Sequence, residues 1–350
     1  MDETTFRILD TLSRALGMSL SINELNRRMH DLHGTAYYAN TYRKLQSLAE
    51  QSIITLTKAG QSSLVTLNFG NYPLIDMLAE MEIKRKQTFL EKQAELQMLF
   101  MEIETCCSQM SHIISISAAH PDNNKKLNRV ELLILLHQEG AHIEQTLAIH
   151  KLMQTIQRMH TIRIDYLILS GSELSSLLAS EEKNPLQEML ADEITILNPQ
   201  GIWYEIRNAR QQGLQIKTSE KETNPAKIPE QDIIHNLARF GYKELGPTLE
   251  KGEDICIEYI ITSVLMGKDA RRITAIPIIL AKNMANSKLL TFLSQKYGVS
   301  GRLLGLLKAL DKIRHTTETE ASIKSLEAMN VKEIEVDEKN IMKKMMQYNA

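Results

Sequence analysis

A set of polar side chains in the segment 36–50 has the chemistry and spacing of a surface that contacts base edges. The set consists of Tyr37, Asn40, Thr41 and Lys44. These residues recur at intervals of three and four, so in a helix they would share one face. An asparagine amide pairs bidentately with adenine, while threonine and tyrosine contact thymine methyl groups or phosphates. We expect this face to be exposed, because Tyr38, Leu45 and Leu48 would then point to the core.

Other polar residues nearby in the sequence could hold phosphate groups on either side of such a contact. They are Arg27, Arg28, Arg43, Lys58, Gln61 and Ser62. Phosphate contacts position a protein on a duplex without specifying its sequence. Residues 21–65 contain five Lys or Arg against three Asp or Glu, so any positive surface there is small and local. The same faces would also suit contact with a protein.

The elements that would position these residues follow from apolar spacing and from a helix-start signal. Apolar residues at helical spacing from Phe6 to Leu16 predict a first helix. A capping box, Ser21 to Glu24, starts a second helix, and a third is expected over 36–50. Runs of alternating polarity at 53–58 and 63–67 predict a β-hairpin.

Three helices followed by a hairpin resemble the winged helix-turn-helix family, and the resemblance covers residues 4–68. It implies that the third helix enters the major groove and that the hairpin, called the wing, lies on the backbone. We therefore expect residues 1–70 to form a domain whose partner is double-stranded DNA.

The middle region, residues 113–218, changes to strands that alternate with helices. Runs of aliphatic residues predict strands at 113–117, 130–136 and 162–169. Amphipathic stretches between and after these strands predict helices. The alternation is typical of an α/β layer.

The layout of residues 113–206 is similar to that of the nucleotidyltransferase family, and the stretches 164–174 and 196–203 look like its stand-alone microbial members. The resemblance implies a Gly-Ser pair that holds a triphosphate, an Asp-x-Asp that holds magnesium ions, and a third carboxylate. At these positions the chain has Ser117 with Ala118, Arg129 with Glu131, and Asp165. A guanidinium at a metal-ligand position repels magnesium, so the resemblance implies a transferase fold that has lost catalysis.

No glycine or proline interrupts the chain from Leu74 to Ile113, so residues 71–112 are expected to form a linking helix. An apolar seam steps by three and four through Leu96, Leu99, Ile103, Cys106, Met110 and Ile113. Such a seam is typical of a coiled coil or a helix bundle. Arg85 and Lys92 interrupt it upstream, which favours a short helical pair. The seam either joins two copies as a homodimer, which we expect, or packs on the α/β region of its own chain.

Helical periodicity returns in residues 219–315, after a polar linker. The stretches 270–277 and 297–305 look like the helical domain that follows the transferase fold in antitoxin-like regulators. Residues 316–350 mix charges evenly, and we expect a charged tail that ends in a loosely held helix.

The composition limits the class of protein. The chain has 350 residues, a length that suits two or three folded domains. Its residues are 43% hydrophobic and 24% charged, and its net charge is -2. No apolar run reaches the roughly 20 residues of a membrane span. Three cysteines without a CxxC pair exclude a disulfide scaffold and favour the cytoplasm. No HExxH or other tight ligand spacing occurs, so neither a metal site nor a cofactor is predicted.

Together these patterns predict a mostly helical α+β protein with an N-terminal winged helix, a linking helix, an inactive transferase-like domain and a C-terminal helical domain. The expected function is sequence-specific DNA binding in transcriptional regulation. The transferase-like domain would then serve dimerisation or the sensing of a protein or small-molecule effector. Two alternatives stay open: a nucleotidyltransferase that uses Glu131 and Asp165 with a displaced metal, and an adaptor whose winged helix binds protein.

Overall fold

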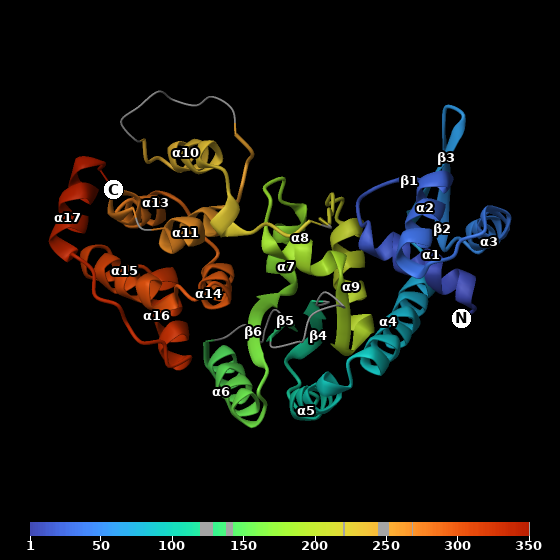
Figure 1. The fold of residues 1–350 in the computed structure, drawn as a ribbon, viewed down its shortest axis with the longest axis horizontal. Coiled ribbons are helices and arrows are strands. Elements are labelled where there is room, and N and C mark those ends of the chain that lie inside the picture. The colour runs from blue at the N-terminus through green and yellow to red at the C-terminus, as the bar shows by residue number, and fades with distance from the viewer. Residues whose placement is uncertain (120–128, 138–142, 220, 244–251, 268, 350) are drawn as a thin grey trace.

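The computed structural model describes residues 1–119, 129–137, 143–219, 221–243, 252–267 and 269–349. Most of these residues lie in helices, and the strands form two small sheets, which confirms the expected α+β, mostly helical class. The N-terminal elements occupy one end of the molecule and the C-terminal helices the other, with the four-stranded sheet between them (Figure 1).

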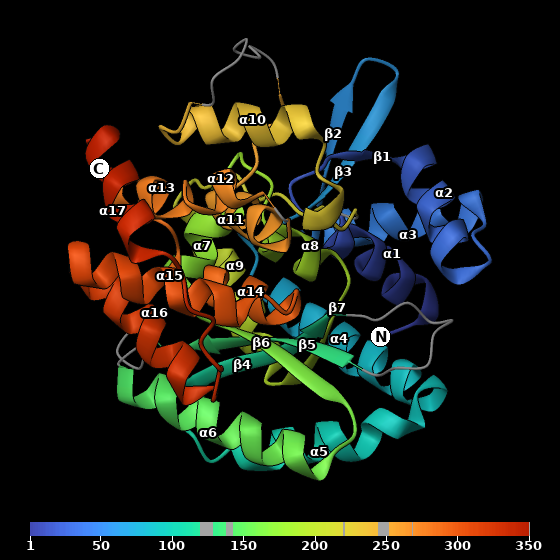
Figure 2. The same ribbon diagram turned by 60° about the vertical axis from the view of Figure 1, so that its left-hand side comes forward.

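The first 70 residues form a unit of three helices and three strands. Its elements are α1 (Glu3–Arg14), β1 (Leu20–Ser21), α2 (Ile22–His33), α3 (Tyr38–Glu50), β2 (Ile54–Ala59) and β3 (Ser62–Leu67). The strands pair antiparallel in the order β1-β3-β2, and the two-residue β1 is not predicted by the sequence pattern. The hairpin β2–β3 projects from the body of the molecule in both ribbon views (Figure 1 and Figure 2).

Local signals fix the two ends of α2. Ser21 begins the helix, because its hydroxyl accepts the backbone amide of Glu24 at 3.2 Å. The Glu24 carboxylate, expected to complete the capping box, binds Arg27 and Arg28. The helix ends at Gly34, whose φ of 74° lies in the left-handed region that favours glycine.

The central sheet has four strands in a mixed arrangement. They are β4 (Ile113–Ala119), β5 (Arg129–Leu136), β6 (Arg163–Ser170) and β7 (Glu193–Leu197). Their order is β6-β5-β4-β7, with β5 and β6 parallel and the other neighbours antiparallel. The strands β4, β5 and β6 lie where the sequence pattern predicts them, whereas the pattern does not predict β7.

Helices cover both faces of this sheet, since its strands are apolar on both sides. The helices α5 (Gln97–Cys107) and α6 (Ile143–Met159) pack on one face. The opposite face is covered by α7 (Gly171–Ala179), α8 (Pro185–Ala191) and α9 (Pro199–Gln211). A carboxylate on either face is therefore removed from water, and its ionised form is stable only if a cation lies beside it.

The linking segment is a helical pair, as expected. A one-turn 3-10 helix, Ala94–Leu96, joins α4 (Pro73–Lys92) to α5. Leu99 and Ile103 of the apolar seam are fully buried, in the same cluster as Ile116 and Ile134 of the sheet. The expectation that this seam joins two copies is wrong, because four of its six side chains are buried within the chain and the other two, Cys106 and Met110, are partly buried beside them.

The C-terminal half is helical. Its helices are α10 (Glu230–Arg239), α11 (Ile257–Met266), α12 (Ala270–Ile273), α13 (Ile276–Lys282), α14 (Ser287–Lys296), α15 (Ser300–Ile313), α16 (Thr317–Ala328) and α17 (Glu338–Gln347). The expected loosely held tail is wrong: α16 and α17 pack on α15 and bury Leu326, Ile341 and Met345. Ile341 and Met345 of α17 stand four apart and form its buried stripe, whereas Met342 and Met346, one position further on, are exposed.

We expect Leu99→Ala to lower the free energy of unfolding by about 2–5 kcal/mol, the usual cost of a cavity in a packed core. Its neighbour Met98, which is 68% exposed, supplies the control, because Met98→Ala should change stability by no more than about 0.5 kcal/mol. Urea denaturation measures both losses, and sedimentation should give the same mass for both variants and the wild type. Loss of a dimer in Leu99→Ala would restore the rejected interface.

Candidate nucleic-acid interface

The helix α3 presents aromatic and polar side chains to solvent. Tyr37, which directly precedes the helix, is 72% exposed, and Asn40 and Arg43 are exposed as well. The rings of Tyr38 and Tyr42 stack with their centroids 6.3 Å apart. Such a pair offers a large rigid surface with polar tips, suited to a sugar, a base edge or an apolar protein patch.

Two residues of α3 lie on the side opposite to the one expected. Thr41 is only 1% exposed, and its hydroxyl donates to Asn26 Oδ1 at 3.1 Å, whereas Tyr38 is exposed. Thr41 precedes Leu45 and Leu48 by four and seven residues, so the three share one buried stripe. The predicted contact of Thr41 with DNA is therefore wrong, while the two leucines face the core as expected.

Three of the basic residues expected to hold phosphates form ion pairs with carboxylates. Lys44 Nζ lies 2.7 Å from Asp2 Oδ2. Arg27 and Arg28 each place a nitrogen 2.7 Å from Glu24 Oε1, and their hydrogen bonds lower the pKa of Glu24 to about 2. A phosphate would have to compete with these carboxylates for the three cations.

Two other predicted phosphate contacts, Arg43 and Lys58, are exposed and form no ion pair within the part of the chain that the structure describes. Gln61 and Ser62 are exposed at the turn of the hairpin, as a wing requires. The helix α3 and the hairpin lie at the same end of the molecule (Figure 1). Tyr42 is not among the residues predicted to contact DNA, although an aromatic residue four positions after Tyr38 was a signal for a shared face.

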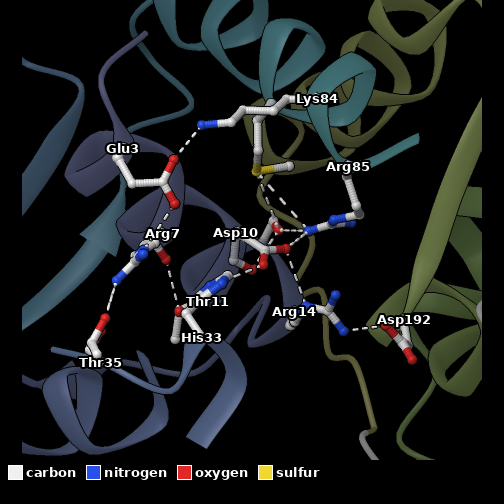
Figure 3. Close-up of polar contacts among 12 residues, drawn as sticks. Glu3, Arg7, Asp10, Thr11, Arg14, His33, Thr35, Lys84, Arg85 and Asp192 are labelled. Carbon is white, nitrogen blue, oxygen red and sulfur yellow. Dashed lines mark hydrogen bonds and ion pairs between the residues drawn. The ribbon is translucent and has the colours of Figure 1, made fainter. Parts of the chain in front are cut away.

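A buried ionic cluster holds this N-terminal unit to the rest of the chain, and Arg85 of α4 is its centre (Figure 3). The guanidinium of Arg85 donates to the carboxylate of Asp10 in α1 and, at 2.9 Å, to Ser13 Oγ. It also donates at 2.9 Å to Glu82 Oε1 and to the backbone carbonyl of Glu193 in β7. The side chains of Arg85 and Asp10 are 7% and 4% exposed, so one cation joins three elements away from water.

Arg14 extends this cluster toward β7. Its Nε lies 3.1 Å from Asp10 Oδ1, and another of its nitrogens binds Asp192 (Figure 3). Burial raises the pKa of Asp10, but the charge of Arg85, the contact with His33 and the charge of Arg14 together outweigh burial and hold the pKa well below its usual range. Burial raises the pKa of Glu193 well above its ordinary value, and the neighbouring Glu82 carboxylate raises it further. The cluster thus favours an ionised Asp10 and a protonated Glu193.

The residues at the transferase-like positions form a second ionic cluster. Asp165 and Glu131 stand side by side in the parallel pair β5–β6. Arg129 Nε lies 2.7 Å from Asp165 Oδ2, and Lys296 Nζ lies 2.8 Å from Glu131 Oε2. Burial raises the pKa of Asp165, while Arg163 and Arg129 act in the opposite direction. Each carboxylate that could bind a metal therefore already has a cation beside it.

The arginines of this second cluster also bind the C-terminal end of α14. Arg129 Nη1 donates to the carbonyl of Lys296 at 3.2 Å, and Arg163 donates to that of Gln295. The last carbonyls of a helix lack partners within it and carry partial negative charge, which cations stabilise. These strand residues thus hold a C-terminal helix against the sheet.

Ser117 and Ala118, at the position of the Gly-Ser pair, are buried within β4. Ser117 Oγ lies 3.5 Å from the hydroxyl of Thr195 on β7, so it contacts the neighbouring strand. Among the described residues, no three His, Cys, Asp or Glu side chains form a group that could hold a metal ion. None of the described helices is long and apolar enough to cross a membrane.

Arg85→Met should lower the free energy of unfolding by about 3–5 kcal/mol, because Asp10 and Glu82 would stay buried without this cation. The matched control is Lys84→Met, since an exposed lysine paired with Glu3 contributes only about 0–1 kcal/mol. Urea denaturation of both variants checks the difference. Equal losses would mean that the cluster contributes no more than a surface ion pair.

Glu193 should make the protein less stable as the pH rises. Because its pKa is raised in the folded state, its contribution is complete below about pH 4 and is lost as the pH approaches the folded-state value. Glu193→Gln stays neutral, so it should gain stability relative to the wild type between about pH 5 and pH 8. Urea denaturation at both pH values, with the exposed Glu91→Gln as control, tests this. A difference from the wild type that does not vary with pH contradicts it.

Comparisons with known proteins find no counterpart of this chain. No protein-family model matches the sequence, and no curated protein or solved structure matches it. The chain is therefore assigned to no family.

Proposed function

We propose that this protein is a transcriptional regulator that binds specific sequences of double-stranded DNA through α3 and the hairpin β2–β3. The observation that best supports this is the exposed face of α3, where Asn40 and Arg43 lie beside Tyr38 and Tyr42. An amide pairs with adenine and a guanidinium with guanine or phosphate, and apolar groups contact thymine methyls. The hairpin residues proposed to contact the backbone are Lys58, Gln61 and Ser62.

The order of helices and hairpin in residues 4–68, similar to a winged helix-turn-helix, supports the same proposal. A single such unit buries only about 600–1,000 Å² on DNA, so we infer that two copies bind two half-sites. The two copies would meet through a surface other than the buried seam of α5. The proposed location is the cytoplasm.

In this proposal the transferase-like region catalyses no reaction. A metal could reach Glu131 and Asp165 only after Lys296 and Arg129 had left them, and both cations also belong to the contact with α14. The region would therefore serve as a scaffold between the DNA-binding unit and the C-terminal helices. Its resemblance to nucleotidyltransferases would be one of fold alone.

The exposed tyrosines of α3 favour a second candidate, an adaptor whose N-terminal unit binds a protein. Tyrosine is enriched at protein interfaces. Of the basic residues expected to contact DNA, only Arg43 and Lys58 are unpaired in the described part of the chain, so the electrostatic contribution to DNA binding would be small.

Selection of bound fragments from a pool of random duplexes distinguishes the two candidates. The purified full chain should enrich one sequence motif, and a symmetric motif with two half-sites would support binding as a dimer. Recovery of fragments at the background level, with no shared motif, would contradict the DNA-binding proposal and favour the adaptor.

On the selected sequence, Asn40→Ala should weaken binding by about 1–3 kcal/mol, the usual contribution of a bidentate base contact. Binding to unrelated DNA should stay the same. Arg43→Ala provides the contrast, because loss of a phosphate contact weakens both DNAs and reduces the salt slope by about one. Fluorescence anisotropy at several salt concentrations measures these effects. Equal losses on both DNAs in Asn40→Ala would show that Asn40 contacts no base.

A further inference from the structure

A cavity of about 150 Å³ lies between the N-terminal unit and α9. Leu12, Leu16 and Phe69 line it from the N-terminal unit, and Ile206 and Ile216 line it from the middle region. All five side chains are buried. The apolar lining thus comes from the proposed DNA-binding unit and from the part of the chain to which this unit is attached.

The segment that follows α9 forms part of the cavity wall and is held tightly against α1. Thr218 donates its amide to the carbonyl of Leu16 at 3.2 Å and its hydroxyl to the carbonyl of Arg14 at 2.8 Å. Gly17 has a φ of +82°, and a Cβ added there would lie 1.7 Å from the carbonyl oxygen of Ile216. Only glycine permits this approach, so the close contact of Gly17 with the wall depends on the absence of a side chain there.

One cation, Arg210 of α9, stands at the edge of the cavity. Its side chain is exposed, and its Nη1 donates to the carbonyl of Leu214 at 3.3 Å. Arg210 pairs with no carboxylate among the residues that the structure describes. Ser19, Thr66 and Gln215 add uncharged polar groups to the lining. A cavity that has buried apolar side chains in its wall, and a guanidinium with other polar groups at its edge, suits a ligand that has a carboxylate at one end and a small apolar group at the other.

We propose that this cavity binds a small amphipathic carboxylate, with its acid group on Arg210 and its apolar part against Leu12, Leu16 and Phe69. A volume of about 150 Å³ accommodates roughly one aromatic ring or a short aliphatic chain. The bound acid regulates DNA binding by the N-terminal unit. This regulatory role rests on the proposed function, whereas the binding of the acid does not.

The position of the cavity lets a bound ligand act on the N-terminal unit. The helix α1 carries Leu12 of the cavity together with Asp10 and Arg14 of the buried ionic cluster. A ligand that contacts both α1 and α9 binds the arrangement in which both helices line the cavity, and so favours it over any arrangement in which the contact of Arg85 with Asp10 is broken.

Calorimetry on the full chain without DNA tests the site. Benzoate and hexanoate are the probes, and benzyl alcohol is the uncharged match for benzoate. We expect at least one acid to bind with a Kd below about 10 mM, a modest affinity for a ligand of so few atoms, and the alcohol not to bind. Arg210→Gln should weaken the acid about tenfold or more. Lys217→Gln is the control, because it removes an equal charge from an exposed side chain next to the wall.

Three results would overturn the site: no binding of either acid, equal binding of the alcohol, or equal affinity in Arg210→Gln and Lys217→Gln. Ala15→Met, which fills the cavity and leaves Arg210 in place, should also abolish binding, and its melting temperature shows whether it is folded. Undiminished binding in a folded Ala15→Met would place the ligand elsewhere.

A second measurement tests the regulatory role separately. On the selected DNA sequence, the acid that binds should change the Kd of the wild type about fivefold or more and leave that of Arg210→Gln unchanged. Acid binding without this change would overturn the regulatory role alone. If no duplex binds with or without the acid, the proposed function fails while the calorimetric result stands.

Discussion

The contact between Arg85 and Asp10 is the interaction on which the arrangement of the whole molecule depends. Arg85 leaves α4 near the middle of the helix and reaches the side chain of Asp10 in α1 and the backbone of Glu193 in β7. A buried ion pair contributes little net stability compared with apolar packing, but it tolerates only one geometry. Apolar side chains could have held α1 on α4 in several registers. The cluster instead fixes how the N-terminal unit sits on the sheet, and so which way α3 faces.

The second cluster has the same function at the other side of the sheet. Arg129 of β5 and Arg163 of β6 both pair with Asp165 of β6, and each also donates to a carbonyl at the end of α14. Two groups of cations therefore attach an N-terminal unit and a C-terminal set of helices to one four-stranded scaffold. These cations act together with one apolar core, which extends from the N-terminal unit across the sheet to the C-terminal helices.

The parts of this fold that follow from local spacing could be predicted from the sequence, and the parts that follow from distant partners could not. The helices α1 and α2, the hairpin and three strands carry their own periodicity. Arg85 looked like an interruption of an apolar seam, because its partner Asp10 is 75 residues away and no periodicity connects them. The short β7 begins with Glu193, which is buried, whereas a glutamate in a sequence normally indicates a surface position. On α3, Thr41 stands four and seven residues before Leu45 and Leu48, and this spacing already predicted that Thr41 would be buried with them.

The contacts of Arg14 also set the order in which the protein can be completed during synthesis. This residue binds Asp192, which lies 178 positions later, and its carbonyl accepts the hydroxyl of Thr218, which lies 204 positions later. At a translation rate of about 5–20 residues per second, the ribosome needs at least roughly 10 s to supply these partners. Until then Arg14 has only Asp10, four residues earlier in α1, as its ionic partner. The contacts of the N-terminal unit with the middle of the chain are therefore complete only after residue 218 has left the ribosome.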